Sequence, residues 1–153
     1  MALHYLEDFV PGQKYATAVV RVTADDIKAF AGQFDPQPFH IDDEAAKGTF
    51  FGGLAASGWH TAALTMKLLV EGELAPAGGI IGAGFEEFRW PRPVRPGDTL
   101  RVESEILAVR ASKSRPQQGL IKVRSTTYNQ NGEEVQVFVG SLVVARRVPA
   151  ETW

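Results

Sequence analysis

An aspartate and a histidine lie five residues apart in the stretch FDPQPFH, residues 34–40. A carboxylate and an imidazole that face one small volume can hold a water molecule and take a proton from it. Two prolines flank Gln37, and each fixes its own φ and biases the residue before it away from the α region. We therefore predict an irregular segment that bends until Asp35 and His40 meet. The alternative is a turn-capping Asp35 and an ordinary half-buried His40, because isolated Asp/His pairs are common.

Composition and charge narrow the class of protein. At 153 residues the chain fits a single domain, residues 1–153, that is long enough to bury a core. The net charge of −2 gives no electrostatic reason to expect a nucleic acid or an anionic membrane as partner. The chain has no cysteine, which excludes disulfides and thiolate catalysis. Three histidines without HxH or HExxH spacing predict no metal site.

The hydropathy pattern predicts a soluble, cytoplasmic protein. No window approaches the roughly 20 apolar residues of a membrane span. The first residues, MALHYLEDFVPGQ, carry neither a basic flank nor an apolar run of signal-peptide length.

Helical signals lie on both sides of the Asp35–His40 segment. Thr23 and Asp26 form a capping-box pattern that begins one helix, and Pro36 ends it. A short acidic helical turn is predicted over 42–48. A longer helix, from Leu54 to about Glu71, is apolar nearly all round, which is typical of a buried central helix.

Gly58 lies near the start of this longer helix, within the run ASGWH, residues 56–60. Glycine lowers helix stability, so its presence needs a reason. One reason is the close approach of a ligand to its backbone, and the other is a tight contact between helix and sheet.

The rest of the chain has the period-two pattern of strands. After an N-terminal arm over 1–12, strands are predicted over 14–22, 79–90, 98–111, 118–129 and 133–147. The sequence NQNG, residues 129–132, is a hairpin signal between the last two, and a frayed tail is predicted over 148–153. This order predicts an α+β fold in which an antiparallel sheet wraps one long helix.

Three stretches resemble the MaoC-like dehydratase family, the (R)-specific enoyl-CoA hydratases built on the hotdog fold. FAGQFDPQPFHIDDEAA (30–46) is similar to the hydratase signature of Asp, then Asn-Pro, then His. GGLAASGWHTAAL (52–64) resembles the beginning of the hotdog helix with its glycine, and FRWPRPVRPGDTL (88–100) the family's Pro-Val-x-Pro-Gly-Asp-Thr-Leu run. Phe34 replaces the usual glycine, Gln37 the usual asparagine, and Ser57 a frequent histidine, so these departures bear on substrate choice more than on the reaction.

The resemblance implies reversible hydration of a trans-2-enoyl thioester in fatty acid metabolism. Asp35 would be the main base, and His40 would hold the water and relay the proton. The backbone N–H of Gly58 would bind the thioester oxygen, with Ser57 assisting and Gln37 supporting the loop. The acyl group would be carried by coenzyme A or an acyl carrier protein, and no cofactor is expected because coenzyme A enters only as part of the substrate. The family also forms homodimers or higher oligomers through edge strands, with the sites near the subunit interface.

Further groups are candidates for the substrate's acyl chain and phosphates. The acyl chain would run between the central helix and the sheet, against residues such as Phe39, Phe50, Phe51, Leu54 and Trp59. The coenzyme A phosphates could meet Arg89, Arg92, Arg95, Lys113 and Arg115. In the alternative interpretation the first group is core and the second is solvated surface.

Two other functions are compatible with the fold. A hotdog thioesterase generally has a carboxylate on the central helix, and residues 54–66 contain neither Asp nor Glu. A non-catalytic subunit that binds acyl thioesters would not need Asp35 and His40.

Overall fold

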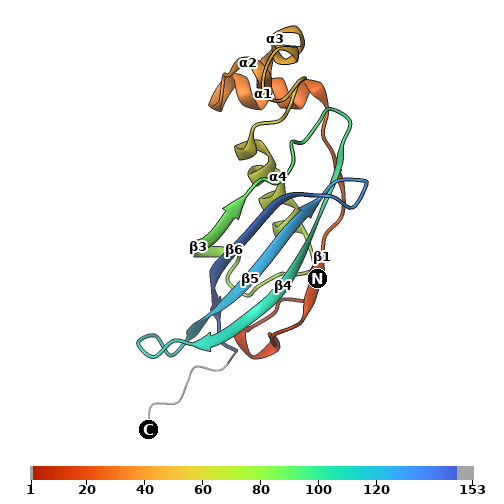
Figure 1. Ribbon diagram of the computed structural model, residues 1–153. Coiled ribbons are helices and arrows are strands. Elements are labelled where there is room, and N and C mark those ends of the chain that lie inside the picture. Colours follow the sequence, from red (N-terminus) through yellow and green to blue (C-terminus); the bar gives the residue numbers. More distant parts are fainter. Residues whose placement is uncertain (1, 148–153) are drawn as a thin grey trace.

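An antiparallel sheet carries much of the chain, and one long helix lies against it in the computed structural model, which describes residues 2–147 (Figure 1). The strands run in the order β1-β4-β5-β6-β3, and β2 pairs with β4 beside β1. Their bounds are β1 Lys14–Ala16, β2 Val20–Arg21, β3 Ile81–Arg89, β4 Thr99–Ala111, β5 Gln118–Tyr128 and β6 Glu134–Ala145. The predicted α+β fold is confirmed.

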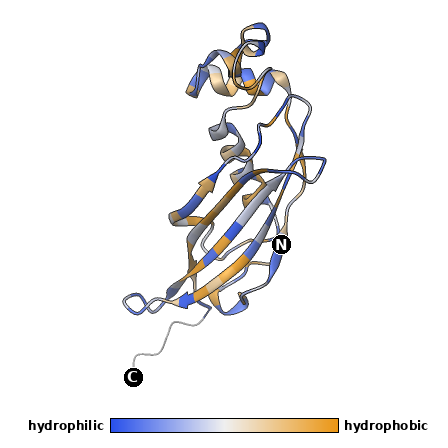
Figure 2. Cartoon of the chain, in the orientation of Figure 1, coloured by the Kyte–Doolittle hydropathy of each residue, from blue (hydrophilic) through white to orange (hydrophobic). Residues whose placement is uncertain are grey.

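The long strands follow the alternation read from the sequence. Val102, Ser104 and Ile106 of β4 are buried, whereas the residues between them are only partly buried. Hydrophobic and hydrophilic residues accordingly alternate along the central strands (Figure 2). The hairpin between β5 and β6 turns at Gly132, whose φ is +73°, as the NQNG pattern predicts.

The single strand predicted over 14–22 is wrong, because the chain forms two short strands, β1 and β2. Between them the hydroxyl of Thr17 accepts a hydrogen bond from the Val102 backbone N–H at 2.9 Å. A side chain thus takes the place of a main-chain ladder bond, and regular pairing stops there.

The helices are η1 Leu6–Asp8, α1 Ala24–Phe34, α2 Pro38–Ile41, α3 Asp43–Lys47 and α4 Gly58–Glu71. The capping box at the start of α1 is confirmed, since Thr23 and Asp26 exchange hydrogen bonds between side chain and backbone. The predicted irregular segment is only three residues long. Helix α2 begins at Pro38, because proline suits the first helical position, where its missing N–H has no helical acceptor.

The predicted start of the central helix at Leu54 is also wrong, since α4 begins at Gly58. Residues 54–57 lie outside the helix because their backbone groups bond elsewhere. Ala55 N–H donates to the Phe39 carbonyl at 3.0 Å, and Ala56 N–H donates to the Val94 carbonyl at 2.9 Å. This segment therefore joins α2 to the connector that precedes β4.

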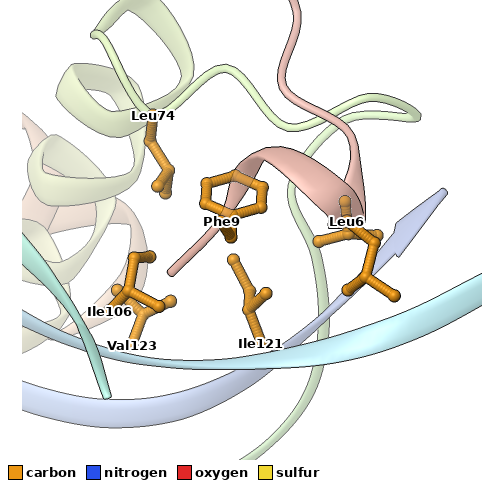
Figure 3. Packing of buried hydrophobic residues seen from close by; sticks show 7 residues of the cluster. Leu6, Phe9, Leu74, Ile106, Ile121 and Val123 are labelled. Carbon is orange, nitrogen blue, oxygen red and sulfur yellow. The ribbon is translucent and has the colours of Figure 1, made fainter. Parts of the chain in front are cut away.

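Helices α1 to α3 gather at one end of the sheet (Figure 1). A buried hydrophobic cluster packs α1 against this end of the sheet. Its members come from α1, residues 54–57, the connector before β4 and the strands: Val22, Ile27, Leu54, Ala56, Val94, Leu100 and Val135. A second cluster involves the N-terminal arm, where Leu6 and Phe9 pack over strand residues such as Ile106 and Ile121 (Figure 3). The arm is therefore part of the core, and the first cluster holds the segment that carries Asp35 and His40.

Helix α4 is buried on one side only, so the prediction of a helix buried all round is wrong. His60, Thr61, Thr65, Leu68 and Leu69 are buried. Its exposed side bears an apolar stripe at helical spacing: Trp59, Ala63, Met66 and Val70. Beside it, β3 forms one edge of the sheet and is exposed at every residue except Phe88.

Within residues 2–147, no helix is long and apolar enough to cross a bilayer. The tail predicted to fray, 148–153, lies outside the described residues.

Candidate active site

The Asp35 carboxylate and the His40 imidazole meet, as the sequence predicts. Asp35 caps the C-terminus of α1, with its N–H donating to the Ala31 carbonyl at 2.8 Å, and Pro36 prevents a further turn. Helix α2 then turns His40 back toward it. His40 Nε2 lies 3.4 Å from Asp35 Oδ2.

The ring of His40 has a defined orientation. Its Nδ1 lies 2.6 Å from the carbonyl oxygen of Ala55, which can only accept a hydrogen bond, so Nδ1 carries the proton. In the neutral imidazole, Nε2 is then the unprotonated nitrogen, and it is the one that faces Asp35. The side chain is 5% exposed, and the rings of Phe39 and Phe51 pack against the imidazole.

Asp35 is held ionised by its neighbours. Partial burial raises the pKa of its carboxyl, but hydrogen bonds from Gln37 and Ser57 outweigh burial, and the imidazole of His40 lowers this pKa further when it is protonated. The pKa of Asp35 is therefore below its ordinary value. Gln37 Nε2 donates to Asp35 Oδ1 at 2.6 Å.

Replacing Gln37 by leucine is expected to raise the pKa of Asp35, because the ionised carboxylate loses a donor. A ¹³C NMR titration of the Asp35 carboxyl carbon measures this. A lowered folded-state pKa stabilises the fold above the unfolded-state pKa, and this contribution is lost as the pH falls through the folded-state value. Gln37→Leu should therefore be less stable than wild type at pH 7, and this difference should shrink in acid. Gln33→Leu on α1 is the control, and an Asp35 pKa equal in both variants would contradict the assignment.

A cavity of about 460 Å³ joins Asp35 and His40 to Gly58, the first residue of α4. Among residues 2–147, no group accepts a hydrogen bond from the Gly58 N–H. An N–H at a helix start has no intrahelical partner, and the helix dipole there favours negative charge. The cavity thus brings a water-holding pair and a free donor together.

Gly58 is also in tight contact with Trp90, which follows β3. A Cβ added to Gly58 would lie 2.7 to 2.9 Å from three carbons of the indole. Of the two reasons considered for this glycine, the structure shows the tight contact, although the close neighbour is a side chain rather than the sheet backbone, and the approach of a ligand stays a prediction.

Ser57 does not line the cavity. It is fully buried, and its side chain caps α4 by accepting a hydrogen bond from the Trp59 N–H at 3.2 Å. Its hydroxyl also lowers the pKa of Asp35 by hydrogen bonding. These contacts suit a residue that orients Asp35 better than one that touches a thioester.

The aromatic residues considered for the acyl chain divide into two groups. Phe50, Phe51 and Trp59 line the cavity, whereas Leu54 lies in the core and Phe39 packs against the His40 ring. Residues 90–94 also line the cavity, and of these only Arg92 is a candidate from the sequence. Their signal was the sequence WPRPV, in which prolines hold an aromatic and a basic residue on extended backbone.

The basic residues do not form one cluster. Only Arg92 borders the cavity, and it pairs with Glu133 at 3.4 Å. The guanidinium of Arg95 donates to the backbone carbonyls of Phe51, Gly53 and Leu54, at 2.5 to 3.2 Å. Arg95 therefore supports the loop that precedes Ala55, the acceptor of His40.

The other basic residues lie away from the cavity or are paired. Arg89 pairs with Glu87 at 2.5 Å. Lys113 and Arg115 lie in the turn between β4 and β5, at the end of the sheet opposite α1 to α3 (Figure 1). In the described part of the chain, no three His, Cys, Asp or Glu side chains are placed to hold a metal ion.

Comparison with known proteins finds a domain family that matches this chain. The MaoC like domain matches residues 8–129. The crystal structure of a MaoC-like dehydratase from Rhodospirillum rubrum is 56% identical, with a TM-score of 0.92 over 95% of this chain and 99% of that one.

Two relatives are named as hydratases. The mesaconyl-CoA hydratase of Cereibacter sphaeroides is 31% identical over 94% of this chain, which spans 41% of that protein. The (R)-specific enoyl-CoA hydratase of Rhodospirillum rubrum is 33% identical over 65% of this chain and 67% of its own length.

Proposed function

Because this chain belongs to the MaoC-like domain family and has the hotdog fold, we propose that it is a hydro-lyase that reversibly hydrates an enoyl thioester to a 3-hydroxyacyl thioester. The acyl group would be carried by coenzyme A or an acyl carrier protein. One observation carries the proposal. Asp35 Oδ2 and His40 Nε2 lie 3.4 Å apart and border the same cavity as the free N–H of Gly58. The hydratase names of two relatives support the reaction class.

Two acceptors side by side can aim a water molecule. The ionised Asp35 and the unprotonated Nε2 of His40 would each accept one O–H of the water. A lone pair of the water oxygen then points away from both and toward C3 of the enoyl group. As the C3–O bond forms, Asp35 takes a water proton, and the π electrons of the C2–C3 bond move onto the thioester as an enolate.

The enolate charge needs a donor at the thioester oxygen. The N–H of Gly58 provides it, and the N-terminus of the 14-residue helix α4 favours the developing charge. When the enolate collapses, the Asp35–His40 pair returns a proton to C2 on the face from which the water attacked. The product is the 3-hydroxyacyl thioester, and the pair is restored.

The two competing functions are less well supported by the site. The only carboxylate on α4 is Glu71, its last residue, at the opposite end from Gly58, so a thioesterase carboxylate is missing from the helix end that borders the cavity. A subunit that only binds acyl thioesters would need neither the ionised Asp35 nor the fixed tautomer of His40.

The test is the loss of enoyl-thioester absorbance when the purified protein is mixed with crotonyl-CoA and then with longer or branched enoyl-CoAs. Hydration removes the conjugated double bond and releases no thiol. Release of free thiol would identify a thioesterase. Binding of acyl-CoA without either change would identify a binding subunit.

We also propose that the protein is a homodimer or a higher homo-oligomer. The free edge of β3 can pair with the same strand of a second copy, which would extend the sheet and protect the edge. The apolar stripe of α4, beside this edge, would be covered in the same contact. Trp59 belongs both to the stripe and to the cavity lining, so the site would lie near the interface.

Replacing Val70 by glutamate is expected to convert the dimer to a monomer, because this side chain is 61% exposed in the single chain and would be buried with its charge unpaired. Light scattering coupled to size-exclusion chromatography measures the mass. Ala29→Glu, at an exposed position of α1, is the control and should keep the oligomer. A Val70→Glu protein with the wild-type mass would refute this interface.

A further inference from the structure

We propose that Trp90 is the specificity-determining wall of the acyl site, and that Gln136 is the positioning residue that holds its indole. This inference rests on the proposed function and concerns which acyl chains the cavity accepts. It links a residue of the connector after β3 to a fully buried residue of β6.

The indole of Trp90 lies beside the position that the substrate would occupy. Trp90 borders the same cavity as Asp35 and His40, and its ring covers Gly58 so closely that a Cβ there would lie 2.7 Å from it. A thioester oxygen bound to the Gly58 N–H therefore has the indole as its neighbour. The acyl carbons, which must also reach Asp35 and His40, extend beside the same ring.

The indole is held in place by a hydrogen bond to a buried side chain. Its Nε1–H donates to Oε1 of Gln136 at 2.8 Å, and Gln136 is fully buried. The Nε2 of this amide has no partner within residues 2–147. A buried amide with an unpaired donor is less favourable than an apolar side chain of similar size, so its bond to Trp90 is what the glutamine contributes.

Packing also restrains the ring. The rings of Trp59 and Phe88 lie edge-on to it, with centroids at 5.5 and 5.0 Å, and Pro91 stiffens the backbone that follows. Phe50, at another border of the cavity, is 96% exposed, and its ring contacts the ring of Phe51 with centroids at 5.4 Å. The space for the acyl chain is therefore bounded on the Trp90 side by a ring that cannot easily move aside.

A fixed wall discriminates by chain size. A methylene that does not fit a pocket changes kcat/KM by about tenfold or more. Removing the indole should favour long chains, and removing only its hydrogen bond should do so to a smaller extent.

The experiment compares wild type with Trp90→Ala, Trp90→Phe, Gln136→Met and the double variant Trp90→Phe/Gln136→Met. For each, kcat/KM is measured with crotonyl-CoA and trans-2-octenoyl-CoA, and Kd with the unreactive butyryl-CoA and octanoyl-CoA. The octenoyl-to-crotonyl ratio should rise about tenfold or more in Trp90→Ala. Gln136→Met should raise it less, and should add nothing in the Trp90→Phe background, because phenylalanine has no N–H to donate.

The outcomes separate this inference from the proposed function. An unchanged octenoyl-to-crotonyl ratio of kcat/KM in Trp90→Ala and Trp90→Phe, with hydration intact, would show that Trp90 does not determine chain-length specificity. An effect of Gln136→Met that persists without the indole N–H would overturn the role of Gln136. If wild type hydrates no enoyl-CoA but the ratio of the two Kd values shifts in Trp90→Ala, the hydratase proposal fails. The inference that Trp90 selects acyl chains by size is then still supported. Trp90→Phe keeps an aromatic ring and remains informative if Trp90→Ala does not fold.

Discussion

Asp35→Asn is expected to lower kcat/KM for enoyl-thioester hydration by about 10²- to 10⁴-fold, the usual contribution of a general base. The amide has nearly the shape of the carboxylate but cannot take a proton from the water. The loss should appear with every acyl chain that the wild type accepts, because the base acts at C3 of all of them. The measurement is the rate of loss of enoyl absorbance under subsaturating substrate.

The fold and the oligomer should survive this change. Asp35 is partly exposed, with 16% of its side chain accessible, and its backbone contact to Ala31 does not depend on the side chain. Asp25→Asn, an exposed position in the first turn of α1, is the matched control and should retain full activity. Near wild-type turnover by Asp35→Asn would show that another group is the base.

Gly58→Ala is expected to lower both stability and activity. Its methyl carbon would lie 2.7 Å from an indole carbon of Trp90, and overpacking of this kind costs about 1–3 kcal/mol. Relief requires either the indole or the start of α4 to move, which displaces the thioester donor from the Asp35–His40 pair. A displacement of about 1 Å can lower the rate by about 10²-fold. Urea unfolding and kcat/KM measure the two effects.

Gly32→Ala is the matched control for this substitution. Gly32 lies within α1, and a Cβ added there meets no atom within 4 Å. Alanine in a helix is more favourable than glycine, so this variant should gain up to about 1 kcal/mol and keep its activity. A Gly58→Ala protein as active and as stable as wild type would mean that the indole yields easily, which would also weaken the role assigned to Trp90.

Several features of the fold follow from local sequence. The capping box of Thr23 and Asp26, the end of α1 before Pro36 and the hairpin at Gly132 each depend on residues within a few positions of one another. The strands also follow from local alternation, and their predicted limits agree with β3 to β6 within two residues. Local rules fail at α2, where a proline that ends one helix is followed by another that begins the next.

Local sequence does not predict where α4 begins, because residues distant in sequence bind the backbone groups that precede it. The start of α4 lies four residues after the predicted one, because Ala55 and Ala56 bond to Phe39 and Val94, which are remote from them in sequence. The same contacts place the Ala55 carbonyl against His40. The tautomer of the histidine is therefore a consequence of tertiary structure, although the histidine itself was recognisable from its spacing to Asp35.

The amino-acid sequence alone predicts Asp35 and His40 on a proline-bounded segment, a glycine at the beginning of a helix, and an α+β fold. These depend on residue type and short spacing, which a sequence states directly. The tertiary structure alone decides that Trp90 packs on Gly58, that Gln136 anchors the indole, that Arg95 supports the loop before Ala55, and that one face of α4 stays exposed. Each of these contacts joins residues more than 30 positions apart, or depends on which strand ends as an edge, and such proximity is created only when the sheet closes around the helix.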